Sequence, residues 1–185
     1  MLKVFSWLIL GLFSSLSSAA NEPLSKSAAD ALQGRIRVVQ HMAMNLSIVS
    51  SVKKQNAEKL SQGLITERDD AWKKSKKTLT PLKRQLMQNQ AGQFLKRRIE
   101  SSSGFNEAFL TDNQGANVAV YPPTSDYWQG DEDKWSQSFN QGNGQVYIGP
   151  VEKDESTQVQ AVQVSVPVID HGKTIGVLVV GVKIN

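Results

Sequence analysis

The chain has 185 residues, a formal net charge of +4 and no cysteine. The lack of cysteine excludes disulfide bonds, thiol catalysis and cysteine-based metal sites. The two histidines, His41 and His171, lie far apart in the sequence, and no group of His, Asp and Glu has the spacing of a zinc site. We therefore expect neither a metal nor a cofactor.

The charge is distributed unevenly along the chain. Residues 21–100 contain sixteen Lys and Arg against seven Asp and Glu, whereas residues 101–185 contain four Lys and ten Asp and Glu. No arginine follows Arg98. A basic half can indicate binding to nucleic acid or anionic lipid, but a solvated helix face explains it more simply.

Residues 1–20 have the features of a cleaved secretory signal. Lys3 supplies the positive start, residues 4–13 form an apolar run, and small residues precede Asn21, where we expect cleavage. The run is shorter than the roughly 20 apolar residues that a membrane span needs; an uncleaved anchor is the alternative. We expect a periplasmic mature domain, 21–185, and export argues against a nucleic-acid partner.

The N-terminal half is predicted to be helical. Apolar residues recur at steps of three and four, which predicts one long helix with a single apolar stripe. These residues are Ala28, Leu32, Ile36, Val39, Ala43, Leu46, Val49 and Val52. Gly63 is the expected end of this helix.

Two further helices are predicted before residue 101. One opens at Thr66, with Asp69 in the capping-box position and Trp72 turned inward. The other opens at Thr80, because the following proline can occupy the first helical position without losing a hydrogen bond. We expect a break in this last helix near residues 89–92.

Beyond residue 101 the pattern changes to the alternation typical of strands. The predicted strands cover residues 105–111, 117–121, 145–151, 159–168 and 175–182. Between the second and third, Asp131 is a suitable N-cap for a short helix that ends near Asn140. Gly176 stands in a β-branched run, and we expect it to be a packing position with little room above it.

These elements predict an α+β domain. Five antiparallel strands joined by short connections form one sheet, and the long N-terminal helix buries its apolar stripe against one face of that sheet. Residues 21–100 then form a helical region and residues 101–185 a β-sheet region of a single domain.

Several stretches resemble the extracytoplasmic Cache (PDC) sensor domains of bacteria. They are GFNEAFLTDNQGANVAVYPPTSDYWQGDEDKW, VYIGPVEKDEST and VQVSVPVIDHGKTIGVLVVGV, with VSSVKKQNAEKL and DDAWKK in the helical half. The resemblance implies a PAS-like five-stranded sheet. Most such domains stand outside a membrane-anchored kinase, cyclase or chemoreceptor, whereas this sequence stops after its last strand. It therefore looks like a stand-alone periplasmic member, whose expected partner is an inner-membrane sensor kinase, cyclase or chemoreceptor.

The resemblance also implies a place for the ligand, on the sheet beneath residues 125–140. The start of that segment, SDYWQGDEDKW, holds three aromatic rings and four carboxylates. In amino-acid-binding members an arginine beside an aromatic pair holds the ligand carboxylate, and a later Tyr and Asp hold the amine. The candidate ligand-binding residues are Tyr121, Asp126, Tyr127, Trp128, Asp131, Trp135, Tyr147 and Asp154.

The ligand expected from these residues is a cationic amine or an amino acid. Tyr127 and Trp128 match the aromatic pair, and Tyr147 and Asp154 match the later residues, but the arginine is missing. Bidentate recognition of a carboxylate is therefore in doubt. Ring faces and carboxylates both attract an ammonium group.

Each of these residues also has a structural explanation. Trp128 and Trp135 can be core residues, Asp131 a helix cap, and Asp126 and Asp154 turn residues. A structural or interaction module with a degenerate pocket is thus the alternative to a ligand-binding sensor. No motif supplies a nucleophile and a base, so we expect no enzyme activity.

Overall fold

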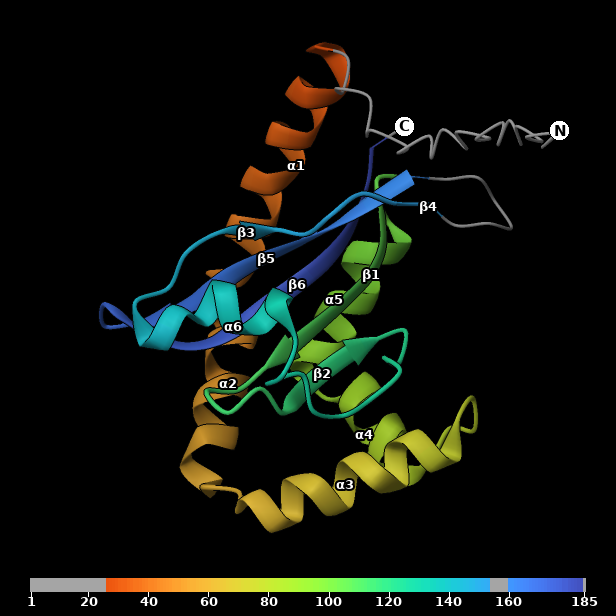
Figure 1. Ribbon diagram of the computed structural model, residues 1–185, viewed down its shortest axis with the longest axis vertical. Coiled ribbons are helices and arrows are strands. Elements are labelled where there is room, and N and C mark those ends of the chain that lie inside the picture. The colour runs from red at the N-terminus through yellow and green to blue at the C-terminus, as the bar shows by residue number, and fades with distance from the viewer. Residues whose placement is uncertain (1–25, 154–159, 185) are drawn as a thin grey trace, which may run out of the picture.

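The computed structural model describes residues 26–153 and 160–184. The predicted signal and its cleavage point lie outside these residues. Five helices come first (Figure 1): α1 (Lys26–Ala43), α2 (Leu46–Glu58), α3 (Gln62–Ser75), α4 (Pro81–Gln88) and α5 (Gln90–Glu100). Of the helices in the described part of the chain, none has the length and hydropathy needed to cross a bilayer.

The predicted single long helix is wrong in one respect, because it is divided at Asn45. Asn45 has an extended backbone and caps α2, and its side chain accepts a hydrogen bond from the Ser47 N–H at 2.9 Å. Asparagine competes for backbone hydrogen bonds in this way, which favours a cap over a helix interior. The apolar stripe still continues across the break, although Leu46 is 78% exposed.

The predicted start of the next helix is also wrong. Helix α3 begins at Gln62, and Ser61 is its N-cap, accepting a hydrogen bond from the Leu64 N–H. Asp69 therefore lies in the middle of α3, where it is buried, and Gly63 lies in its first turn. Trp72 is buried, as expected.

The third predicted helix is confirmed, including its break. Thr80 caps α4 and accepts a hydrogen bond from the Lys83 N–H, with proline at the first helical position. Asn89 ends α4 and caps α5, accepting a hydrogen bond from the Gly92 N–H at 2.8 Å.

One antiparallel sheet follows the helices, and its strands and interspersed short helices are β1 (Phe105–Thr111), β2 (Asn117–Tyr121), α6 (Asp133–Phe139), η1 (Asn140–Gly142), β3 (Tyr147–Ile148), β4 (Glu152–Lys153), β5 (Gln160–Asp170) and β6 (Lys173–Lys183). The strand order is β2-β1-β6-β5-β3. Strands β3 and β4 pair with successive parts of β5, so they share the fifth position of the sheet. The five-stranded antiparallel arrangement is thus confirmed.

The fifth position is more broken than the predicted strand 145–151. Gly149 and Pro150 separate β3 from β4, although the Gly149 N–H still donates to the Gln163 carbonyl at 2.9 Å. The strand order places this broken strand at the edge of the sheet, where a proline, which has no N–H to donate to a ladder, is tolerated.

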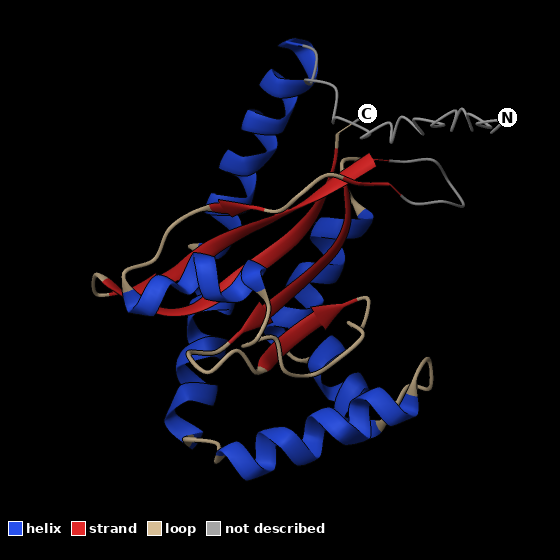
Figure 2. Ribbon diagram, in the orientation of Figure 1, coloured by secondary structure: helices blue, strands red, loops and turns tan. Residues whose placement is uncertain are grey.

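The sheet separates two packed layers (Figure 2). Helices α1, α2 and α5 pack on one face, and α6 packs across β5 and β6 on the other. The alternation of β5 is as predicted: Val162, Val164, Val166 and Val168 join the core beneath the long helices. Gln163 and Ser165 point toward the α6 face, where the candidate site lies.

Candidate ligand-binding site

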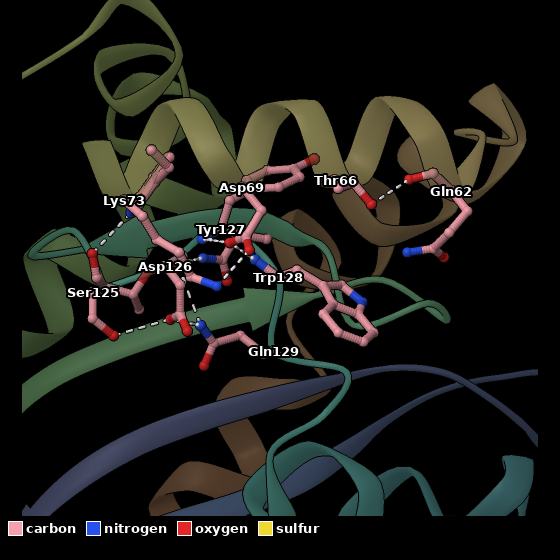
Figure 3. A network of polar contacts seen from close by, with 12 residues as sticks. Gln62, Thr66, Asp69, Lys73, Ser125, Asp126, Tyr127, Trp128 and Gln129 are labelled. Carbon is pink, nitrogen blue, oxygen red and sulfur yellow. Dashed lines mark hydrogen bonds and ion pairs between the residues drawn. The ribbon is translucent and has the colours of Figure 1, made fainter. Parts of the chain in front are cut away.

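Residues 125–129, which lead from β2 toward α6, are anchored to helix α3 by Asp69 (Figure 3). One oxygen of this buried carboxylate accepts the N–H groups of Tyr127 and Trp128 at 2.9 and 3.0 Å. The other oxygen lies 2.6 Å from the Lys73 ammonium. Asp69 thus fixes the position of the segment that precedes α6.

The same segment is joined to the turn between β1 and β2. The Asn117 N–H donates to the Tyr127 carbonyl, and the Gln129 N–H donates to the Gly115 carbonyl at 2.8 Å. Gly115 has a φ of +82°, and a Cβ there would lie 2.5 Å from the Gly130 Cα. Only glycine satisfies both conditions at this position.

Asp112 holds that turn in shape. Its Oδ1 accepts hydrogen bonds from the Gln114 and Ala116 N–H groups, and its Oδ2 accepts one from Gln55. Burial raises the pKa of Asp112, while the hydrogen bonds oppose this rise. The turn is therefore built around a buried carboxyl group that is satisfied by neutral donors.

Tyr127 is fully buried between α3 and the sheet. Its ring centroid lies 5.9 Å from that of Trp72, and its hydroxyl lies 3.3 Å from a guanidinium nitrogen of Arg68. Burial raises the pKa of the Tyr127 hydroxyl. These contacts place Tyr127 in the hydrophobic core.

The two tryptophans of the segment are half-buried and point back to the turn at residues 112–115. Trp128 donates to the Gln114 carbonyl at 2.7 Å, and Trp135 donates to the Asp112 carbonyl at 3.3 Å. The Trp135 ring stacks on Phe139 at 4.8 Å between centroids. Both indoles therefore hold the α6 region against the sheet, in agreement with their structural explanation.

Asp126 has a local role. Its Oδ1 accepts hydrogen bonds from the Gln129 side chain at 2.5 Å and the Ser125 hydroxyl at 3.0 Å. Gln129 is almost completely buried. Asp126 thus stabilises the conformation of residues 125–129.

An open cleft of about 360 Å³ lies between the start of α6 and the strand edge formed by β3 and β4. Its lining residues are Asp131, Glu132, Asp133, Lys134, Tyr147, Gly149, Pro150, Glu152 and Gln163. Of the residues predicted from the sequence, the cleft brings together Asp131 and Tyr147. Asp154 lies outside the described residues.

Tyr121 lies apart from this cleft. It packs with the core beneath the long helices, and its hydroxyl donates to the Glu100 carboxylate at 2.5 Å. Asp131 is exposed and is not the helix cap that the sequence predicted. Glu132 occupies the cap position of α6, without a capping hydrogen bond from its side chain.

The cleft is strongly acidic but contains one cation. Four carboxylates line it, from Asp131, Glu132, Asp133 and Glu152, and Lys134 supplies an ammonium group. The Lys134 side chain is only 20% exposed; its ammonium lies 3.6 Å from the Glu132 carboxylate and 5.8 Å from the Phe109 ring centroid. Such a set of charges can accept an ammonium group and also offers one cation to an anionic group.

Sequence reasoning missed Lys134, Glu152 and Gln163. Lys134 directly precedes Trp135, but it was not a candidate because the resemblance implied an arginine as the cation of the site. Gln163 is held by a hydrogen bond to Glu107 at 2.9 Å, which joins residues 56 positions apart. Within the described residues, no three His, Asp or Glu side chains form a group that could hold a metal ion.

No protein-family model and no curated protein matches the chain. The extracellular domain of a protein assigned as the histidine kinase vpHK1S-Z8 matches with a TM-score of 0.50 and 9% identity, over 85% of this chain and 52% of that one. A domain of a sensory box/GGDEF family protein from Vibrio parahaemolyticus matches with a TM-score of 0.48 and 10% identity, over 86% and 56%. The ligand-binding domain of the Pseudomonas aeruginosa amino-acid chemoreceptor PctC, solved with GABA, matches with a TM-score of 0.47 and 19% identity, over 85% and 56%.

The chain therefore spans about half the length of these solved domains. At such identities the similarity establishes the fold. It confirms the predicted α+β fold, with helices at the N-terminus and one five-stranded antiparallel sheet.

Proposed function

We propose that the chain is a periplasmic sensing or binding protein that takes a small molecule with a cationic amine into the α6 cleft. The observation that carries this proposal is the charge composition of the cleft, which is lined by four carboxylates and one partly buried ammonium. A carboxylate holds an ammonium by a charge-assisted hydrogen bond. Lys134 can in addition meet the carboxylate of a zwitterion, a role for which the sequence offered no arginine.

The roles of the individual residues follow from their positions. Asp131 and Glu152 lie on opposite sides of the cleft and offer carboxylates to the amine, while Tyr147 contributes a ring. Asp126 orients the segment that leads to α6. Tyr127, Trp128 and Trp135 do not line the cleft, and their contacts with Trp72, the turn at residues 112–115 and Phe139 hold the surrounding structure in place.

The proposed output is a relay to an inner-membrane partner, such as a sensor kinase, cyclase or chemoreceptor. The supporting feature is the sensor-domain fold, in which extracellular ligand binding precedes signalling. We propose no catalytic role, because no sequence motif pairs a nucleophile with a general base, and the described residues that line the cleft include no serine, threonine or histidine.

A calorimetric panel tests the site. Simple amines (ethanolamine, putrescine), amino acids (serine, isoleucine) and carboxylates (acetate, succinate) are titrated into the protein. We expect an amine or amino acid to bind, and Glu152→Gln or Asp131→Asn to weaken that binding by about 1.5–3 kcal/mol, roughly 10- to 150-fold, as for hydrogen bonds to charged groups.

The matched control is Asp30→Asn, which removes the same charge from an exposed position on α1. It should leave the affinity unchanged. Binding of carboxylates alone, or unchanged amine affinity in Glu152→Gln and Asp131→Asn, contradicts the assignment. A panel without any binder favours the alternative, a structural module with a degenerate pocket.

A further inference from the structure

A second cavity, of about 470 Å³, lies between the end of α3, the start of α4 and the chain that follows β2. Its lining residues are Lys73, Lys76, Lys77, Leu79, Lys83, Pro123, Thr124 and Ser125. Four of these eight residues are lysines, whose side chains end in ammonium groups, and none of the eight carries a carboxylate. The cavity shares no residue with the α6 cleft.

Lys83 is the most unusual member of this group. Its side chain is almost fully buried, with 1% of the residue exposed. The ammonium donates to the Lys76 carbonyl at 2.5 Å and lies 5.1 Å from the Trp72 ring centroid. In the described part of the chain no carboxylate forms an ion pair with it. Burial lowers its pKa.

A structural role explains part of this arrangement. The Lys76 carbonyl ends helix α3, so Lys83 satisfies one backbone acceptor, and lysines near a helix C-terminus are favoured by the helix dipole. An ammonium has three donors, however, and only one is used here. A buried charge without an anion is costly. Lys76 and Lys77 line the same cavity, and their like charges add to the cost of keeping Lys83 charged.

We propose that the lysine cavity binds a small organic phosphate. Because Asp69 already pairs with Lys73, the ammonium groups of Lys76, Lys77 and Lys83 provide the excess positive charge that a phosphate dianion requires, whereas a single carboxylate would need only one of them. Lysine suits this task because its ammonium acts as a point charge toward phosphate. Leu79 and Pro123 give the cavity an apolar wall, which suits an organic body attached to the phosphate.

The cavity adjoins the anchor of residues 125–129. Lys73 is the ion-pair partner of Asp69, and the Trp72 indole donates to the Thr124 carbonyl at 2.9 Å. A bound phosphate therefore bridges α3, α4 and the start of the segment that leads to α6. Binding to the native state alone should raise the melting temperature.

The test is calorimetry and thermal shift with phenyl phosphate, inorganic phosphate and benzoate at matched ionic strength, together with a binding assay on vesicles that contain phosphatidic acid. We expect phenyl phosphate to bind more tightly than benzoate and to raise the melting temperature. The double variant Lys76→Gln/Lys77→Gln should weaken its binding at least about tenfold, since each loses a charged contact. Lys83→Met should do the same. The control, Lys26→Gln/Lys173→Gln, removes two exposed lysines elsewhere and should stay within about twofold of the wild type, because distant surface charges are screened.

Three results would overturn the proposal. The first is that phenyl phosphate does not bind to the wild type. The second is that the Lys76→Gln/Lys77→Gln variant binds phenyl phosphate as tightly as the wild type does. Because this variant alters only exposed side chains, its result is decisive even if Lys83→Met does not fold. The third is binding only to vesicles that contain phosphatidic acid, without binding of the soluble phosphates, because the ligand would then be a lipid surface.

Discussion

A Gly176→Ala variant is expected to lose roughly 3 kcal/mol of the free energy of unfolding, the upper part of the range for overpacking a core. The added Cβ would lie 2.2 Å from the Thr111 carbonyl oxygen and 3.0 Å from a methyl carbon of Val52. Thr111 belongs to β1 and is hydrogen-bonded to β6, so relief requires two paired strands to separate. The lack of room at Gly176 confirms the prediction from its β-branched surroundings.

Thermal unfolding measures this effect. The melting temperature should fall by about 6–12 °C, since 1 kcal/mol corresponds to roughly 2–4 °C in a domain of this size. Gly34→Ala is the control, because the nearest atom to its Cβ is 4.0 Å away, and an alanine inside helix α1 should add about 0.5–1 kcal/mol. A Gly176→Ala protein that melts with the wild type would refute the packing account of β6.

An Asp69→Ala variant is expected to lose on the order of 3 kcal/mol of the free energy of unfolding. The substitution leaves the N–H groups of Tyr127 and Trp128 without an acceptor, and an unsatisfied buried donor costs about 1–3 kcal/mol. Asp69→Asn should cost less, because its amide oxygen can still accept both hydrogen bonds. The partly exposed ion pair with Lys73 contributes at most about 1 kcal/mol.

Hydrogen exchange separates this role from a general loss of stability. Relative to the wild type, Asp69→Ala should accelerate exchange at the amides of Tyr127 and Trp128 more than at those of the sheet centre, such as Val179. Asp70→Ala, at an exposed neighbouring position, should change neither rate. Equal protection of Tyr127 and Trp128 in the wild type and in Asp69→Ala would show that α3 does not anchor this segment.

The fold could be predicted from the sequence wherever the signal is local. The alternation of Val162 to Val168, the Thr80 cap and the Asn89 break each depend on neighbouring residues, and each is confirmed. The division at Asn45 was missed because the apolar period runs through it unchanged. Only the capping bond to Ser47 reveals the end of one helix and the start of the next.

The candidate site was less predictable because its contacts join distant parts of the chain. Asp69 meets the Tyr127 N–H across 58 positions, so its position in the sequence favoured a local cap. The rings of Tyr127 and Trp135 resemble ligand contacts in sequence, yet burial and stacking assign them to packing. The sequence alone does not identify Lys134 as the cation of the cleft, because its position depends on how α6 packs on the sheet.

The central claim is that the α6 cleft is the ligand site, and amide chemical-shift mapping tests it most directly. The isotope-labelled protein is titrated with the tightest-binding amine or amino acid of the calorimetric panel. The proposal predicts that the largest shifts fall on residues 131–134, Tyr147 and Glu152, on both sides of the cleft. Shifts confined to residues 73–83, or spread without a maximum at the cleft, would contradict it.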